Sequence, residues 1–192
     1  QQVEAPYWID VTEVTRAQYA LCSTAGVCPT TLSSSYSTRA TQPINRIIWV
    51  EAAAYCEWRG MRLPTELEWE YAARGPSSWI YPWGDDFESA SVIDADSSGG
   101  LTADVGSRSS GASWVGAFDM SGNVWEWTSS FYVEYPYAAD THEGDPNAPE
   151  PQRVLRGGAF DNVAANLRAS DRYANPWDYR NYVFGFRCVR PV

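Results

Sequence analysis

The hydrophobic and polar positions of the first 75 residues predict three short helices. In two of them a threonine is followed three positions later by glutamine or glutamate, which is the spacing of a capping box. Each predicted helix stops at a glycine, the residue that most easily adopts the backbone conformation of a helix end. The opening and closing residues are Thr15, Gln18, Ala25 and Gly26 for the first helix, Val50, Arg59 and Gly60 for the second, and Thr65, Glu68, Arg74 and Gly75 for the third.

Beyond Gly75 the pattern changes to short apolar or aromatic runs separated by Gly, Ser, Asp, Asn and Pro, which predicts loops and short strands. Residues 94–113 and 135–152 are rich in small, acidic and proline residues, and we expect both to be exposed loops rather than linkers between domains. The length suits one domain, so residues 1–192 are expected to fold as one unit.

The composition explains how so many irregular segments can be held together. Hydrophobic residues make up 44 % of the chain and include ten tryptophans and twelve tyrosines. Their rings bury a large area while their N–H or O–H groups can bond to loop backbone. No run approaches the roughly 18 consecutive apolar residues that a membrane-spanning helix needs, so membrane insertion is not expected.

The charge argues against two classes of partner. Fourteen basic residues, all arginine, face twenty-four acidic ones, which gives a formal net charge of −10. Long-range attraction to nucleic acid or to anionic lipid is therefore unfavourable. The arginines also stand singly among apolar residues, which favours internal hydrogen bonding over a phosphate-binding patch.

The four cysteines, Cys22, Cys28, Cys56 and Cys188, are even in number and include no C-x-x-C pair, so two disulfides are favoured. The alternative is four reduced thiols in a cytosolic protein. Cys22 and Cys28 flank the predicted end of the first helix, where a local bridge would fit. The chain starts at Gln1 without a leader, as a processed or a trimmed protein would, and we expect a secreted, periplasmic or cell-surface location.

Seven segments in a fixed order resemble the family that contains the formylglycine-generating enzyme and the sulfatase-modifying factors. The match extends over nearly the whole chain, and the shared order makes it specific although each segment alone could arise by chance. The segments are YWIDVTEVT from Tyr7, AYC from Ala54, RLPTELEWEYAARG from Arg62, YPWG from Tyr81, GNVWEWT from Gly122, RVLRGG from Arg153 and GFRC from Gly185.

The resemblance implies an α+β, C-type-lectin-like fold with few short helices, a small twisted antiparallel sheet and a high loop content. It also implies that Cys56 pairs with Cys188. Such a bridge would close a loop of more than a hundred residues, and by chain-entropy estimates it would stabilise the fold by roughly 5 kcal/mol.

The oxidase chemistry of the family depends on two cysteines shortly after the Arg-Gly-Gly turn, which bind copper. The corresponding segment here, residues 157–168, contains no cysteine. Thiolates are the soft ligands that hold Cu(I), and asparagine or aspartate cannot replace them. We therefore expect no copper and no formylglycine-generating oxidase activity.

A calcium loop of the family resembles the segment 121–126. By that match Ser121, Gly122 and Val124 would offer carbonyl oxygens and Glu126 its carboxylate, all hard ligands suited to a structural Ca²⁺. The alternative is a tight turn in which Glu126 bonds to nearby backbone.

Other candidate catalytic residues have structural explanations. His142 is the only histidine and lies in an acidic, proline-rich loop, where a solvated side chain is expected. Glu66, Glu68 and Glu70 alternate along one helix and do not share a face. Capping and first-turn roles are therefore expected for them rather than acid–base catalysis.

The stretch 160–184 carries the candidate binding surface. Rigid aromatic rings beside adaptable hydrogen-bonding groups are typical of a binding surface. In retroelement-diversified proteins that share the fold, the matching segment is the variable ligand-binding surface, and the residue types here fit such variation. Ordinary family members with loops rich in asparagine and tyrosine are the alternative. The candidate ligand-binding residues are Asp161, Asn162, Asn166, Tyr173, Trp177, Tyr179 and Tyr182.

These features predict a noncatalytic recognition or structural module that binds a protein or another extracellular ligand. Two alternatives are a retroelement-diversified binding protein and a copper-independent enzyme or enzyme accessory. For the enzyme, the polar groups to inspect are Arg156, Arg168, Arg172 and Asn162. Carbohydrate recognition follows from the fold by analogy only. The sequence does not predict the oligomeric state.

Overall fold

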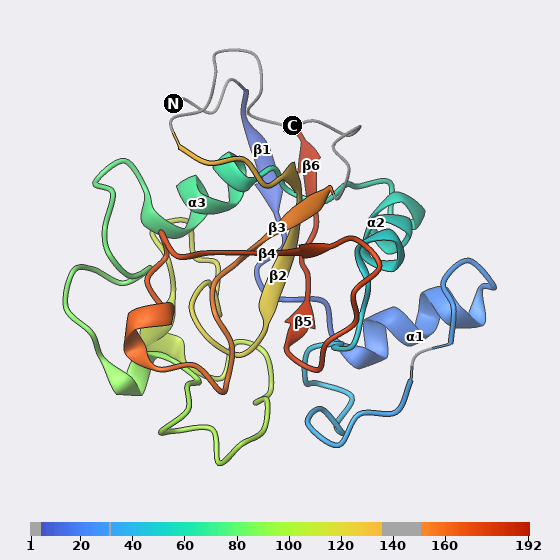
Figure 1. The fold of residues 1–192 in the computed structure, drawn as a ribbon, viewed down its shortest axis with the longest axis horizontal. Helices are drawn as coiled ribbons and strands as arrows, with labels where there is room; N and C mark the ends of the chain where they lie inside the picture. Colours follow the sequence, from blue (N-terminus) through green and yellow to red (C-terminus); the bar gives the residue numbers. More distant parts are fainter. Residues whose placement is uncertain (1–4, 31, 136–150) are drawn as a thin grey trace.

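The computed structural model describes residues 5–30, 32–135 and 151–192 (Figure 1). Within these ranges the chain has three α-helices, three 3-10 helices and six strands, joined by long loops. In chain order the elements are β1 (Tyr7–Ile9), α1 (Arg16–Thr24), α2 (Trp49–Trp58), α3 (Glu66–Arg74), η1 (Ser89–Ser91), η2 (Ser109–Gly111), β2 (Trp125–Phe131), β3 (Gln152–Arg156), η3 (Ala164–Asn166), β4 (Arg172–Pro176), β5 (Phe184–Gly185) and β6 (Val189–Pro191).

Both predicted capping boxes are present, and they fix where α1 and α3 begin. The N–H of Gln18 donates to Thr15 Oγ1 at 3.2 Å, and Gln18 Oε1 accepts the N–H of Thr15 at 2.8 Å. The same reciprocal pair joins Thr65 and Glu68, at 3.1 and 2.8 Å. Each pair satisfies two backbone N–H groups that would otherwise lack a partner at the helix start. These two helix starts are therefore encoded locally.

The second helix, α2, begins at Trp49, one residue before the predicted start. A side chain within its first turn provides the cap, because Glu51 Oε2 accepts the N–H of Ile48 at 3.1 Å. The helix ends at Trp58, and Gly60 follows with a φ of 69°, as the sequence predicts. Among the described residues no helix is both long and apolar enough to span a membrane.

Four strands form the main sheet in the order β4-β3-β2-β5. β4, β3 and β2 are antiparallel neighbours, as expected, whereas β5 pairs in parallel with β2. In that pairing Phe184 lies opposite Trp125 and Gly185 opposite Glu126. A Cβ on Gly185 would lie 2.8 Å from the carbonyl oxygen of Ile44, so only glycine fits where β5 passes this loop. The antiparallel sheet is thus extended by one short parallel strand.

A second, two-stranded sheet brings the first and last strands, β1 and β6, side by side (Figure 1). In the same view α3 flanks the main sheet at the upper left, and α1 and α2 lie at the right. Trp8 of β1 pairs with Arg190 of β6 in this small sheet.

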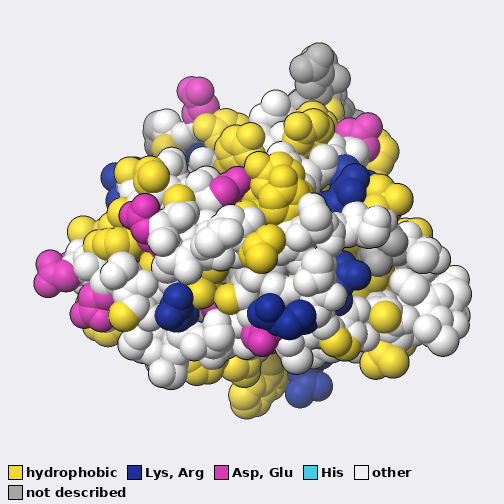
Figure 2. Space-filling model, turned by 90° about the horizontal axis from the view of Figure 1, so that it is seen from below, with side chains coloured by type: hydrophobic (Ala, Val, Ile, Leu, Met, Phe, Trp, Pro, Cys, Tyr) yellow, Lys and Arg dark blue, Asp and Glu magenta, His cyan; other side chains and the backbone are white. Residues whose placement is uncertain are grey.

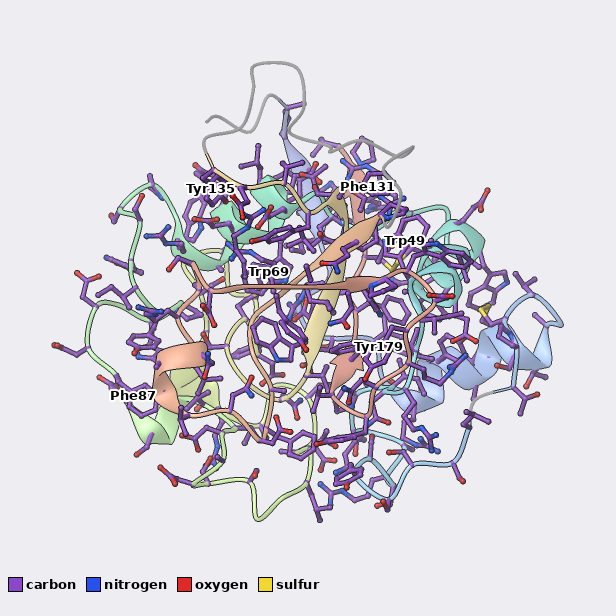
Figure 3. All side chains as sticks on the ribbon, viewed as in Figure 1. Trp49, Trp69, Phe87, Phe131, Tyr135 and Tyr179 are labelled. Atoms are coloured by element: carbon purple, nitrogen blue, oxygen red, sulfur yellow. A yellow bond between two sulfur atoms is a disulfide. The ribbon has the colours of Figure 1, made fainter. Side chains whose placement is uncertain are left out.

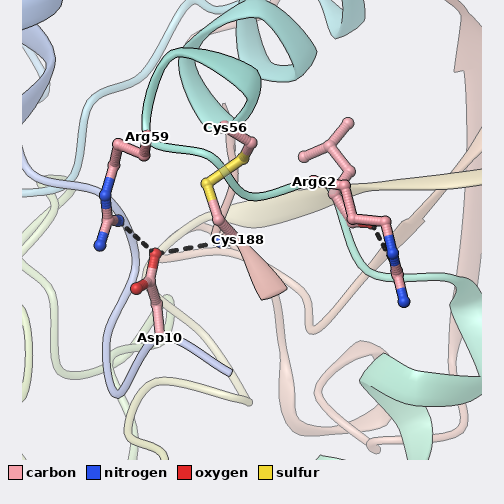
Figure 4. Close-up of a disulfide and its surroundings, with 6 residues drawn as sticks. Asp10, Cys56, Arg59, Arg62 and Cys188 are labelled. Atoms are coloured by element: carbon pink, nitrogen blue, oxygen red, sulfur yellow. Dashed lines mark hydrogen bonds and ion pairs between the residues drawn. A yellow bond between two sulfur atoms is a disulfide. The ribbon is translucent and has the colours of Figure 1, made fainter. Parts of the chain in front are cut away.

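Both disulfides are confirmed. Cys22 and Cys28 link the end of α1 to the following loop, and Cys56 and Cys188 link α2 to the residue before β6 (Figure 4). The second bridge spans 132 positions of the chain. Asp10, next to β1, accepts the N–H of Cys188 at 3.2 Å. The long bridge therefore lies where β1, α2 and β6 meet.

Aromatic side chains fill the space between the helices and the sheet (Figure 3). Tyr19 of α1 and Tyr55 of α2 stack with ring centroids 5.6 Å apart, and Trp127 of β2 meets Phe184 edge to face at 5.2 Å. The indole N–H of Trp127 donates to the carbonyl of Ile47 at 2.9 Å. Large rings thus bury apolar area and also satisfy loop backbone, which is the role that the composition predicts.

The loop 94–113 is largely exposed, as its composition predicts, but it is anchored to the rest of the molecule at a few buried residues. Thr102 is buried, its N–H donates to the carbonyl of Tyr36 at 3.0 Å, and its own carbonyl accepts Nε2 of Gln42. The composition did not reveal these anchors, because it does not show which backbone groups find partners on a distant loop. The other predicted excursion lies mostly in residues 136–150, which together with His142 fall outside the described residues.

Candidate functional site

The candidate segment 160–184 contains η3, β4 and the start of β5, and it therefore contributes to both edge strands of the main sheet (Figure 1). Tyr173 of β4 and Tyr179 after it both pack against the buried ring of Phe184, each with a centroid separation of 6.1 Å. Tyr173 also contacts Trp125 at 5.4 Å, and Tyr179 lies beside β5 (Figure 3). Each ring is held from behind, yet 44 % of Tyr173 and 48 % of Tyr179 stay exposed.

Tyr182 belongs to a second aromatic contact. Its ring stacks on Tyr36 with centroids 4.3 Å apart, and its hydroxyl donates to Asp161 Oδ2 at 3.2 Å. The negative charge of Asp161 raises the pKa of the Tyr182 phenol. Tyr36 comes from the N-terminal half and was missed, although a lone tyrosine in a serine-rich loop is a signal that could have been used.

Together these residues form what we call the aromatic face: Tyr36, Tyr173, Trp177, Tyr179 and Tyr182. Each of the five is at least 36 % exposed. Trp177 is tied to α2 because its carbonyl accepts the N–H of Trp49 at 3.0 Å. Seen from below, the molecule shows hydrophobic side chains gathered near the middle with arginine side chains among them (Figure 2). The structure thus places four candidate residues in one exposed set with Tyr36.

The two candidate asparagines have local structural partners. Asn162 Oδ1 accepts the N–H of Ala159 at 3.0 Å, and its carbonyl accepts the N–H of Ala95 at 3.0 Å. Asn166, in η3, donates from Nδ2 to Asp171 Oδ2 at 3.3 Å. Both residues therefore shape the turn through local hydrogen bonds.

The segment after the Arg-Gly-Gly turn is tightly packed. Gly157 and Gly158 adopt φ values of 98° and 77°, which favour glycine. A Cβ on Gly158 would lie 2.6 Å from the side chain of Leu167, which is fully buried. All four cysteines of the chain are bound in disulfides, so no thiolate is available to this segment.

Two of the three arginines named as catalytic candidates, Arg156 and Arg172, take part in ion pairs that hold α3 against the sheet. Arg156 is fully buried and lies 2.5 Å from Glu70 and 3.5 Å from Glu66. Arg172 contacts both oxygens of Glu66, at 2.6 and 2.9 Å. Arg168 is half exposed and lies 3.9 Å from Asp171. Among the glutamates of α3, Glu68 has the predicted capping role, whereas Glu66 and Glu70 pair with the first two arginines.

Glu126 has a partner that neither sequence-based interpretation anticipated. Its carboxylate accepts Nε and Nη2 of Arg187, each at 2.7 Å, and the indole N–H of Trp69 at 2.8 Å. Both charged residues are fully buried. Trp69 lies between α3 and the sheet (Figure 3). Glu126 belongs to β2, and Arg187 lies between β5 and β6. The ion pair therefore connects β2 to the last segment of the chain.

Two further buried carboxylates surround this pair. Glu13 accepts the N–H of Val124 at 3.0 Å and Nδ2 of Asn123 at 2.7 Å, and Asp119 accepts the N–H of Gly106 at 2.6 Å. Burial raises the pKa of Asp119 to about 6. Burial, with the charges of Asp119 and Glu126, raises the pKa of Glu13. Three carboxylates therefore share one guanidinium.

The expected calcium ligands can be tested against this arrangement. Ser121, Gly122 and Val124 are buried beside the three carboxylates, and Ser121 Oγ donates to the carbonyl of Leu167 at 2.7 Å. The donor atoms are all oxygens and the negative charge is in excess, which fits a hard cation. Among the described residues no three His, Cys, Asp or Glu side chains form a metal-binding group. A calcium ion here would therefore depend on backbone carbonyls, because both oxygens of Glu126 already accept hydrogen bonds from Arg187 and Trp69.

Few short helices around a small sheet, long packed loops and a buried GNVWEW segment define a formylglycine-generating-enzyme-like domain with the C-type-lectin-like fold. The chain belongs to the family of sulfatase-modifying factor enzyme 1-like domains, whose family model matches residues 1–192. PvdO from Pseudomonas aeruginosa shares the fold with a TM-score of 0.83 at 23 % identity, over 97 % of this chain and 81 % of that one. Treponema denticola variable protein 1 gives a TM-score of 0.78 at 22 % identity, over 97 % and 84 %.

Curated relatives show higher identity. The inactive C-alpha-formylglycine-generating enzyme 2 of Bos taurus is 39 % identical over 77 % of this chain and 50 % of the relative. The formylglycine-generating enzyme of Streptomyces coelicolor is 33 % identical over 96 % of this chain and 61 % of the relative. The chain spans a quarter to about three-fifths of the length of such relatives.

Proposed function

We propose that this domain is a noncatalytic recognition module of an extracytoplasmic protein and that it binds a protein partner through the aromatic face. The observation that carries the proposal is the exposure of five aromatic side chains, four of which, Tyr36, Tyr173, Tyr179 and Tyr182, have rings packed against neighbouring rings. Rings held in this way lose little conformational entropy on binding, which is why tyrosine and tryptophan dominate binding surfaces.

The chemistry of the remaining residues supports a noncatalytic role. The buried arginines are used in ion pairs with Glu66, Glu70 and Glu126, and the cysteines are used in disulfides. A relative with 39 % identity is named an inactive enzyme, which is consistent with members of this family that do not catalyse. The two disulfides support a location outside the cytoplasm, because such bonds persist in oxidising compartments.

The test uses a phage-displayed library of random 12-residue peptides panned against the wild-type domain. Peptides that bind the aromatic face should lose at least about tenfold in affinity for a triple variant Trp177→Ala, Tyr179→Ala, Tyr182→Ala, because anchor residues of this type contribute about 1.4 kcal/mol or more. The matched control is Trp8→Ala with Val11→Ala, two exposed residues near β1. Enriched peptides that bind the triple variant as tightly as the wild type would contradict the proposal.

A further inference from the structure

A groove of about 360 Å³ continues the aromatic face onto the N-terminal half of the chain. One wall is the turn that contains Tyr179 and Tyr182, and the other is the loop that contains Tyr36. Arg46 and Arg180 also line it, together with the hydroxyl groups of two serines, so its lining is mostly polar. The lining residues are Ser34, Ser35, Tyr36, Arg46, Tyr179, Arg180, Asn181 and Tyr182.

The two arginines of the groove differ in how their charge is balanced. Arg180 is paired with both carboxylate oxygens of Glu51, at 2.8 and 2.7 Å. Arg46 donates from Nη1 to the carbonyl of Ser33 at 2.8 Å, and no acidic side chain of the described residues forms an ion pair with it. The groove therefore contains one guanidinium whose positive charge is not neutralised by a described carboxylate.

The backbone of Arg46 is also unusual. Its φ is 60°, a region that non-glycine residues occupy rarely and at a free-energy cost. Such residues persist where the surrounding structure holds them, and they are enriched at sites of function. Glycine or asparagine would adopt this conformation more easily, so an arginine at this position is not explained by the turn itself.

Hydrogen bonds hold the two walls in a fixed relation. Asn45, which is fully buried, donates from Nδ2 to the carbonyl of Tyr182 at 2.6 Å. Arg180 Nη1 donates to the carbonyl of Arg46. The turn carrying Tyr179 and Tyr182 is therefore docked on residues 45 and 46. Arg46 is held beside the two tyrosines even before a partner protein binds. A site that is organised before binding loses less free energy on association.

We propose that this groove receives one acidic side chain, an aspartate or glutamate, of the protein partner bound by the aromatic face. The inference rests on the proposed function and identifies the chemistry of the partner at one point of the interface. A guanidinium and nearby hydroxyl groups are all donors, and a carboxylate is an acceptor that matches them. Asp161, hydrogen-bonded to Tyr182, would repel a second acid. A single acid flanked by uncharged residues therefore fits better than an acidic run.

The experiment compares peptides selected from the random 12-residue library by the wild-type domain and by Arg46→Gly. Wild-type selection should enrich peptides with one aspartate or glutamate. Replacing that acid by its amide should weaken binding to the wild type by about 10-fold to 100-fold, the range for a hydrogen bond to a charged group. With Arg46→Gly the acid and amide peptides should differ by less than about threefold, because the partner of the acid is gone.

Two variants separate recognition from folding. Glycine suits a positive φ, so Arg46→Gly should melt at the same or a higher temperature than the wild type. Arg190→Gln removes an arginine on the exposed end of β6 and should leave the preference for the acid intact. If no selected peptide depends on the aromatic face, the proposed function fails. If peptides depend on the face but carry no acid, or keep the preference for it with Arg46→Gly, only the groove inference fails.

Discussion

The ion-pair centre around Arg187 and the aromatic face differ in how their charged groups are buried and paired. In the centre, Arg187 and Glu126 are fully buried and bonded to each other at two atoms. Beside the aromatic face, Arg46 lies in an open groove, and its side chain donates to the backbone carbonyl of Ser33. In the first arrangement both charges are shielded from water and neutralise each other. In the second, a positive charge remains accessible to a group of a binding partner.

The difference shows which polar residues belong to the scaffold and which to recognition. A buried charge must be paired because its desolvation is costly, so the arginines of the centre are tied to the fold. An exposed aromatic ring or guanidinium costs the fold little stability when no partner is bound. A variant in the centre should therefore change folding, and a variant on the face should change binding with little effect on folding.

The largest effect is expected from Arg187→Met. Loss of the guanidinium leaves Glu126 buried without its partner and beside two other carboxylates, so the free energy of unfolding should fall by about 3–5 kcal/mol. Urea unfolding followed by tryptophan fluorescence measures it. Adding Glu126→Gln should restore part of the loss, since the orphaned charge is then removed. Arg190→Met, on the exposed β6, is the control and should cost less than about 0.5 kcal/mol. A loss under about 1 kcal/mol for Arg187→Met would show that the centre does not carry the fold.

A smaller effect is expected from calcium. We propose a structural Ca²⁺ beside this centre, held by carbonyl oxygens of Ser121, Gly122 and Val124 with Asp119 as its carboxylate, because both oxygens of Glu126 are bonded to Arg187. At about a hundredfold excess over its Kd, the ion should add roughly 2.7 kcal/mol to the free energy of unfolding. Thermal unfolding with 10 mM CaCl₂ or with a chelator measures this, since the Kd of extracellular calcium modules lies near 0.1–1 mM.

The matched variant for this test is Asp119→Asn. It should abolish the calcium-dependent rise in melting temperature and leave the response to MgCl₂ unchanged, because Mg²⁺ fits less well in a site built on carbonyl oxygens. If the wild type melted at the same temperature in calcium and in chelator, the calcium proposal would be wrong. Protonation and Arg187 alone would then balance the three buried carboxylates.

Local features of the fold could be predicted from the sequence because their causes are local. The capping boxes at Thr15 and Thr65 involve residues three positions apart, and the bridge from Cys22 to Cys28 spans six. The bridge from Cys56 to Cys188 spans 132 positions, and only the family resemblance identified it. Sequence periodicity states which residues are apolar, and it does not state which distant segment they meet.

The candidate site was predicted in part for the same reason. Its composition identified the rings between residues 173 and 182, but Tyr36 and Arg46 lie more than 120 positions away and join them only through the fold. Arg187 is likewise 61 positions from Glu126. The short parallel strand β5 explains the second case, because it places the chain before Arg187 next to β2. Such pairings depend on topology rather than on any local pattern.

The smallest effect is expected on the aromatic face, at Asp161. Its charge raises the pKa of Tyr182 in the folded state. The stabilisation of the fold that comes from the neutral phenol is therefore fully present below the pKa of the unfolded state, and it is lost as the pH rises through the pKa of the folded state. Asp161→Asn should therefore lower the pKa of Tyr182. It should change the free energy of unfolding by less than about 0.5 kcal/mol, because the pair is exposed.

NMR titration of the tyrosine Cζ carbons measures this pKa, with Tyr182→Phe identifying the signal. Asp171→Asn removes a carboxylate that bonds to Asn166 instead, and it should leave the titration of Tyr182 unchanged. If Asp161→Asn lowered the free energy of unfolding by more than about 1.5 kcal/mol, the face would be part of the scaffold. The contrast with the Arg187 centre would then disappear, since both regions would use their charges to hold the fold.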